Sequence, residues 1–215
     1  MKSQRHYSTF DRICLSLDQA VRALADNAKT TGQPYPAKHV EEKIMSEEQR
    51  KHAAALMRIN HTGEICAQAL YHAQGLVSRD LQTQNKMQQS AIEEGDHLAW
   101  CKQRLDELGS HTSYLNPFWY AGSFCLGMAA GMVGDGWSLG FVAETERQVI
   151  KHLAGHLTLL PEEDQRSYKI LAKMETDEAK HRDEALSAGG KELPSIIKIG
   201  MKLMSKLMVK TTYFV

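Results

Sequence analysis

Apolar residues recur three or four positions apart along most of this 215-residue chain, with no long runs of single alternation. A spacing of three or four residues is typical of an amphipathic helix, whereas strict alternation of apolar and polar residues is typical of a half-buried strand. The pattern therefore predicts an all-α protein. Ser46 can cap a helix start, Pro161 suits a first helical turn, and Gly189-Gly190 ends a helix. The predicted helices span residues 10–27, 46–75, 81–108, 137–159, 161–187 and 194–210.

Four of these helices carry a glutamate in the middle of the apolar stripe that should face the core. In two of them a histidine follows three residues later, so both side chains project from one face of the helix. Two neighbouring acids, Glu93 and Glu144, fall on more polar faces. The predicted core-facing set is Glu64, Glu94, His97, Glu146, Glu178 and His181.

The spacing of the set repeats along the chain. Glu64 and Glu94 are separated by about the same distance in sequence as Glu146 and Glu178, and a histidine follows the second glutamate of each pair. The chain therefore reads as two helix pairs of one design. Buried carboxylates are costly unless cations lie between them, and carboxylate with imidazole suits iron or manganese. Ferritin-like di-metal bundles have this arrangement; the alternative is a set of solvated acids on amphipathic helices.

Composition excludes some classes of function. Lys plus Arg and Asp plus Glu number 26 each, so no global field favours nucleic acid. The four cysteines form no Cys-x-x-Cys pair, which favours buried, reduced thiols over a disulfide framework. The N-terminus lacks the apolar core of a secretory signal and makes a poor transit peptide. We expect a single-domain bacterial cytoplasmic protein.

Four motifs around these acids resemble the demethoxyubiquinone hydroxylases, the di-iron monooxygenases of ubiquinone biosynthesis. The resemblance covers roughly residues 46–215, and the first 45 residues are less diagnostic. Arg58 precedes the first motif and Tyr71 follows it. The motifs are Asn60-His61-Thr62-Gly63-Glu64, Glu93-Glu94-Gly95-Asp96-His97, Glu144-Thr145-Glu146-Arg147-Gln148 and Asp177-Glu178-Ala179-Lys180-His181.

The resemblance implies that the six core-facing residues are ligands of two iron ions, with Glu94 and Glu146 expected as the bridging or flexible pair. It implies O2-dependent hydroxylation of 5-demethoxyubiquinol, a polyprenyl benzoquinol, in the penultimate step towards ubiquinone. No Gly-x-Gly-x-x-Gly motif follows a predicted strand, so electrons would enter with the quinol, reduced by NADH directly or by a partner. A lipid-binding accessory protein and a homo-oligomer are further partners that it allows.

Residues around the predicted ligands have weaker signals. His61 is either a further ligand or, by preference, a histidine at the edge of the core. His152 and Tyr71 are candidate relays for protons, or for electrons in the case of Tyr71, and a packed core residue is the alternative for Tyr71. Asp96 and Asp177 either orient the imidazoles or are exposed.

Two segments favour a membrane surface. Residues 113–134 carry no charge and are long enough to span a bilayer, but crossing would put the two helix pairs on opposite sides. We therefore expect residues 113–136 to be a crossover packed on the bundle at the interface, with Gly127 and Gly131 allowing close helix contact. The tail repeats lysine every fourth residue beside an apolar side, which suits an anionic membrane, or else a core-docked helix with a solvated stripe. The tail lysines are Lys198, Lys202, Lys206 and Lys210.

The predicted organisation is one ferritin-like di-iron domain over residues 1–215. It comprises an N-terminal helix and linker (1–45), the ligand-bearing bundle with its crossover (46–188) and the basic amphipathic tail (194–215). The expected location is peripheral, on the cytoplasmic face of the bacterial inner membrane. The main alternative function is a ferritin-like protein that stores iron or removes peroxide, and a membrane-surface adaptor is the second.

Overall fold

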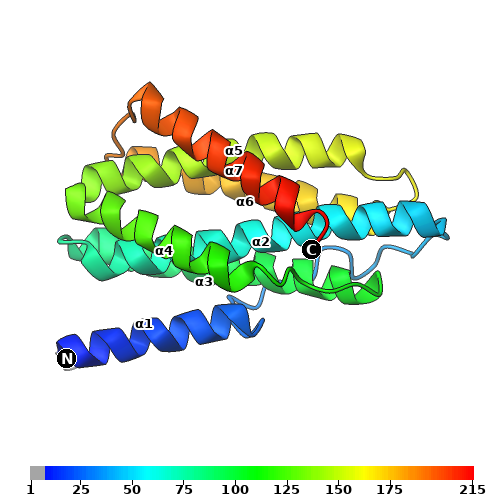
Figure 1. Ribbon diagram of the computed structural model, residues 1–215, viewed down its shortest axis with the longest axis horizontal. Coiled ribbons are helices and arrows are strands. Elements are labelled where there is room, and N and C mark those ends of the chain that lie inside the picture. The colour runs from blue at the N-terminus through cyan, green and yellow to red at the C-terminus, as the bar shows by residue number, and fades with distance from the viewer. Residues whose placement is uncertain (1–7) are drawn as a thin grey trace.

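The computed structural model describes residues 8–215, and Figure 1 shows its arrangement. The described residues form helices and no strands, which confirms the predicted all-α fold. The helices are α1 (Thr9–Leu24), α2 (Glu47–Val77), α3 (Leu81–Glu107), α4 (Asn116–Val133), α5 (Asp135–Leu159), α6 (Gln165–Ser187) and α7 (Ser195–Thr212).

Helices α2, α3, α5 and α6 run along the long axis and form a ferritin-like four-helix bundle (Figure 1). Their inward residues form one packed cluster that includes Met57, Leu105, Leu153 and Leu171, each nearly inaccessible to solvent. This burial stabilises the bundle and fixes which face of each helix looks inward. The glutamates predicted to be core-facing lie on those inward faces.

Local polar contacts set the helix ends. Ser46 caps α2 through a capping box with Gln49, as predicted. The helix predicted to begin at Pro161 begins instead at Gln165, because the Asp164 side chain accepts a hydrogen bond from the Ser167 N–H. Asp164 also pairs with the fully buried Arg104 at 2.8 Å, so it is held where a cap is needed.

Helix α4 lies close against α2, since their small residues leave room for the two backbones. A Cβ on Gly127 would come within 2.8 Å of the Leu70 carbonyl oxygen, and one on Gly131 would collide with Val77. This confirms the predicted close contact at these glycines. None of the described helices is long and apolar enough to cross a membrane.

Helices α1 and α7 pack outside the bundle. Helix α1 rests on α2 through Ala23, and Asp26 just beyond it bonds to His61. Helix α7 crosses over α5 and α2 (Figure 1), and Tyr213 at its end bonds to His52 of α2. All four cysteines are free, and the predicted burial holds for Cys101 but fails for Cys14 and Cys125 because α1 and α4 turn these towards solvent. The remaining thiol, Cys66, is half-buried.

Candidate metal centre

The bundle brings all six predicted residues together in its interior. Each is at most 3% exposed, although all six are ionisable. They come from all four bundle helices: Glu64 from α2, Glu94 and His97 from α3, Glu146 from α5, and Glu178 and His181 from α6. Side chains of this kind are rarely buried unless they are paired or bind a metal.

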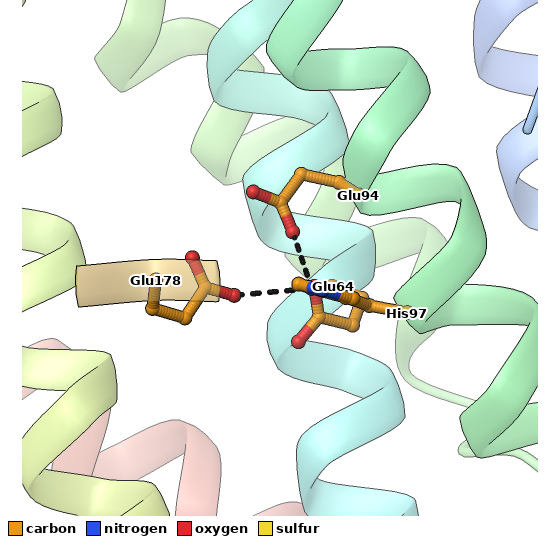
Figure 2. A group of neighbouring side chains, drawn as sticks. All are labelled: Glu64, Glu94, His97 and Glu178. Carbon is orange, nitrogen blue, oxygen red and sulfur yellow. Dashed lines mark hydrogen bonds and ion pairs between the residues drawn. The ribbon is translucent and has the colours of Figure 1, made fainter. Parts of the chain in front are cut away.

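One half of the cluster surrounds the Nδ1 atom of His97, as Figure 2 shows. This nitrogen lies 3.0 Å from Glu94 Oε2, 3.2 Å from Glu178 Oε1 and 3.8 Å from Glu64 Oε2. One ligand atom from each of the four residues lies within 4.8 Å of the others. A group of this size and composition can hold a metal ion.

The other half surrounds His181 and uses the second oxygen of two of the same carboxylates. His181 Nδ1 lies 2.8 Å from Glu94 Oε1 and 3.3 Å from Glu178 Oε2. The rings of His97 and His181 have centroids 6.4 Å apart. Glu94 and Glu178 therefore lie between the two histidines, each with one oxygen towards either ring.

Between the two histidines, Glu94 lies with Glu178 and not with Glu146, the partner expected from the resemblance. Glu94 and Glu178 come from the two Glu-x-x-His turns on facing helices, so each carboxylate meets its own histidine and the opposite one. Glu146 enters from the side, and its Oε1 accepts a hydrogen bond of 2.7 Å from the Tyr71 hydroxyl. Tyr71 is 3% exposed, so this contact is inside the core.

The outer nitrogens of both histidines bond to acids from the facing helix. His97 Nε2 lies 3.1 Å from Asp177 Oδ2, and His181 Nε2 lies 2.8 Å from Glu93 Oε2. Each of these acids directly precedes a clustered glutamate in the sequence. Such contacts fix the ring orientation and turn Nδ1 towards the centre. Asp177 thus has the orienting contact considered for it.

Three acids beside the cluster make contacts that the sequence did not predict. Glu93 is half-buried on the more polar face, where Gln89 donates to it, and it also reaches across to His181; its position in the repeat, equivalent to Asp177, was the available signal. Asp96 contacts no imidazole and instead accepts hydrogen bonds from Thr31 and Gly32 of the linker. Glu144 is buried, and its carboxylate accepts hydrogen bonds from Arg147 and Gln148 of its own helix.

His61 and His152 lie outside the cluster. His61 is fully buried, and its Nε2 bonds to Asp26 at 2.8 Å, which agrees with the core-edge interpretation rather than with a ligand. The Nε2 atom of His152 is buried without a hydrogen-bond partner. The ring of His152 lies 3.9 Å, centroid to centroid, from that of His156.

The electrostatics show that the cluster requires positive charge. Burial, together with neighbouring carboxylates, raises the pKa of Glu64 and Glu146 well above the ordinary value. Burial opposes the charged forms of Glu94 and His181 too, but their mutual attraction outweighs it, lowering the pKa of Glu94 and raising that of His181 to about 12. Protons on the imidazoles thus balance the carboxylates. A metal ion can replace those protons.

The geometry of Glu94 also fits a metal better than a hydrogen bond. Its Oε1 is buried without a hydrogen bond of normal geometry, although His181 Nδ1 is only 2.8 Å away. An ion that both atoms coordinate as neighbouring ligands would satisfy both of them. The donor set contains carboxylate oxygens and imidazole nitrogens but no thiolate, which suits iron or manganese.

Residues 51–212 match the model of the family described as "Ubiquinone biosynthesis protein COQ7". The chain belongs to this COQ7 family. It is 55% identical over 210 residues, 98% of this chain and 99% of the relative, to a 3-demethoxyubiquinol 3-hydroxylase of Acinetobacter baumannii. Proteins of the same name from Stutzerimonas stutzeri and Nitrosococcus oceani are 52% and 49% identical, over 213 and 211 residues, which are 99% and 98% of this chain and 99% of either relative.

These findings confirm the resemblance to the demethoxyubiquinone hydroxylases and the prediction of a hydroxylating enzyme. The COQ7 family match includes all six clustered residues and extends over α2 to α7. The match to the Acinetobacter protein covers nearly the whole chain.

Proposed function

We propose that this protein hydroxylates the ring of demethoxyubiquinol with O2 at a di-iron centre. The observation that carries the proposal is the buried, two-fold arrangement of Glu94 and Glu178 between His97 and His181, in a chain of the COQ7 family. Two iron ions, when bound, would supply the activation of O2 that ring hydroxylation needs.

The donor atoms fall into two ligand groups. Glu64 and His97 would serve one ion, and Glu146 and His181 the other. Glu94 and Glu178 would bridge both ions, since each has one oxygen on either side. This assignment uses all four bundle helices and leaves no carboxylate of the cluster unpaired.

The other residues would position the ligands and protect the centre. Asp177 and Glu93 hold the outer nitrogens of the imidazoles, and Tyr71 holds Glu146. Burial and the nearby Glu146 raise the pKa of Tyr71, so its hydroxyl remains a hydrogen-bond donor. The same hydroxyl bonds directly to Glu146 and would be able to pass a proton to it. His152, the second predicted relay, bonds to no residue of the cluster.

The outer surface suits a substrate with a long polyprenyl tail. Helix α7 exposes apolar side chains along its length, and α4 exposes Phe118, Met132 and Val133. The lysines of α7 add positive charge beside them. We propose that this face rests on an anionic membrane, on the cytoplasmic side. The exposed apolar residues of α7 are Ile196, Ile197, Ile199, Leu203, Met204 and Leu207.

Turnover of a defined substrate tests the proposal. Protein loaded anaerobically with Fe(II) is mixed with a short-chain demethoxyubiquinol and then with O2, and the quinones are separated by mass. We expect a hydroxylated product in the wild type and none in Glu178→Ala. NADH is omitted in one arm, which shows whether the quinol alone can supply the electrons.

A protein that stores iron or removes peroxide would give a different result. It would oxidise Fe(II) or consume peroxide without changing the quinol. A strain that lacks the gene provides the second test, because accumulated demethoxyubiquinone supports the hydroxylase and normal ubiquinone contradicts it.

A further inference from the structure

A second polar group is buried between α2 and α5, beside the metal centre but outside the ligand set. It comprises Asn60 of α2 with His152 and His156 of α5. The Asn60 Oδ1 atom lies 3.0 Å from His156 Nδ1, and the rings of His156 and His152 are 3.9 Å apart. Asn60 is 3% exposed and His156 is 5% exposed, whereas His152 is half-buried with its Nε2 atom inside. Polar groups this deep normally have all their hydrogen bonds satisfied.

Two atoms of this group have no partner. Asn60 Nδ2 and His152 Nε2 are both buried without a hydrogen bond. Because a carboxamide oxygen only accepts, His156 Nδ1 must donate to Asn60, and this bond turns the Asn60 amide nitrogen away from His156. Burial lowers the pKa of His152 to about 4, so its ring is neutral at pH 7 and Nε2 can exchange a hydrogen bond with a hydroxyl. An unpaired buried polar group is expensive, and a ligand can remove that cost.

Space for a ligand lies next to these atoms. A Cβ built on Gly63 would meet nothing within 4 Å, although this residue directly precedes Glu64. The contacts Asn60–His156 and Gln74–Ser138 show that α2 and α5 are antiparallel, so Gly63 lies level with the turn of α5 that carries His152. Gly63 is half-buried and lies three residues beyond Asn60 on α2, so the open space beside it adjoins Asn60, is level with His152 and directly precedes the ligand Glu64.

We propose that Asn60 and His152 bind the ring oxygens of the quinol substrate, in the space beside Gly63. A para-quinol ring is flat and has a hydroxyl at either end, and each hydroxyl can donate and accept. The Asn60 N–H donates to one oxygen, and His152 Nε2 pairs with the other. This inference rests on the proposed function, and it makes Asn60 and His152 the residues that select a quinol ring over an apolar one.

The test measures binding and turnover separately. Iron-loaded protein is dialysed anaerobically against a short-chain demethoxyubiquinol and against its two mono-O-methyl ethers, in which one hydroxyl is blocked. We expect Asn60→Ala and His152→Ala to bind the quinol about tenfold more weakly, the effect of one lost hydrogen bond. Each variant should also lose the discrimination against one of the two ethers. The iron content and unfolding temperature of both variants should equal those of the wild type. If the two residues had only a structural role, the substitutions would lower the unfolding temperature or the iron content.

A glycine pair supplies the matched control and keeps the test decisive if Asn60→Ala fails to fold. Gly155 on α5 also has nothing within 4 Å of a built Cβ, but it is exposed. We expect Gly63→Leu to weaken quinol binding at least tenfold and Gly155→Leu to leave it unchanged.

The outcomes separate this inference from the proposed function. If the wild type hydroxylates the quinol and the variants bind it equally well, Asn60 and His152 do not bind the ring oxygens, although the protein is a hydroxylase. A water molecule would then occupy the space. If quinol binding depends on Asn60 but the wild type gives no turnover, the binding site is supported and the proposed hydroxylase function is contradicted.

Discussion

Replacing Glu146 by Gln should stabilise the metal-free protein and weaken its response to metal. Burial is the main reason that the pKa of Glu146 lies well above its ordinary value, with Glu178 and Glu94 adding to the effect. A carboxyl group with a raised folded pKa must take up a proton on folding whenever the pH exceeds its unfolded pKa of about 4.3. The side-chain oxygen of Gln can still accept the hydrogen bond from Tyr71, so the substitution removes mainly this protonation cost.

The size of the effect follows from the pH range. The cost is absent below about pH 4, grows by about 1.4 kcal/mol per pH unit above it, and reaches a ceiling of about 4 kcal/mol at pH 7. A buried amide also loses hydration, so we expect a net gain of about 2 kcal/mol at pH 7. In a protein of this length that raises the unfolding temperature of the metal-free form by roughly 4–8 °C.

The assay is thermal unfolding of chelator-treated protein at pH 4.5 and pH 7, with and without added Mn(II) or Fe(II). The exposed Glu162, in the loop before α6, provides the control Glu162→Gln, which should change neither quantity. Wild type should gain stability from metal, and Glu146→Gln should gain less, since an amide is a poorer ligand than a carboxylate. If the metal-free variant is less stable than wild type at pH 7, or is equally stabilised at both pH values, Glu146 does not take up a proton on folding.

Three further predictions concern positioning, packing and the outer face. Asp177→Asn and Glu93→Gln should each weaken Mn(II) binding roughly 10- to 100-fold without unfolding the protein, because the imidazoles lose their charged partners; binding titrations against Glu162→Gln check this. Arg104→Met should cost about 3–5 kcal/mol in urea unfolding, since it leaves Asp164 buried without its cation; a loss below about 1 kcal/mol would contradict the assigned role. Changing Leu203 and Leu207 of α7 to Gln should abolish flotation with anionic vesicles while iron content stays the same, and unchanged flotation would rule out the membrane face.

Much of the metal centre could be predicted because the sequence of each helix shows which of its faces is buried. Glu64 and Glu146 stand in apolar stripes, and a stripe fixes which side of a helix turns inward. The position of Glu178 between the two histidines and the contact between Glu93 and His181 could not be obtained this way. Both depend on how α3 and α6 face each other, and a single-helix pattern carries no information on that distance.

The predicted start of α6 was wrong for a related reason. Pro161 is a good first residue for a helix, but Asp164 is held by Arg104 from α3 and can cap only a helix that starts after it. At Asp164 a tertiary contact overrode a local preference. The reason at Glu144 is local, because Arg147 and Gln148 of the same helix bond to its carboxylate.

The source of the oxygen atom in the product is the sharpest test of an O2-dependent hydroxylase. Iron-loaded protein, short-chain demethoxyubiquinol and ¹⁸O₂ in ordinary water are combined for a limited turnover, and the product is analysed by mass spectrometry. We expect a product that carries one ¹⁸O atom in its new hydroxyl group, and no product from Glu178→Ala. An unchanged quinol, or a hydroxyl oxygen derived from water, would contradict this expectation.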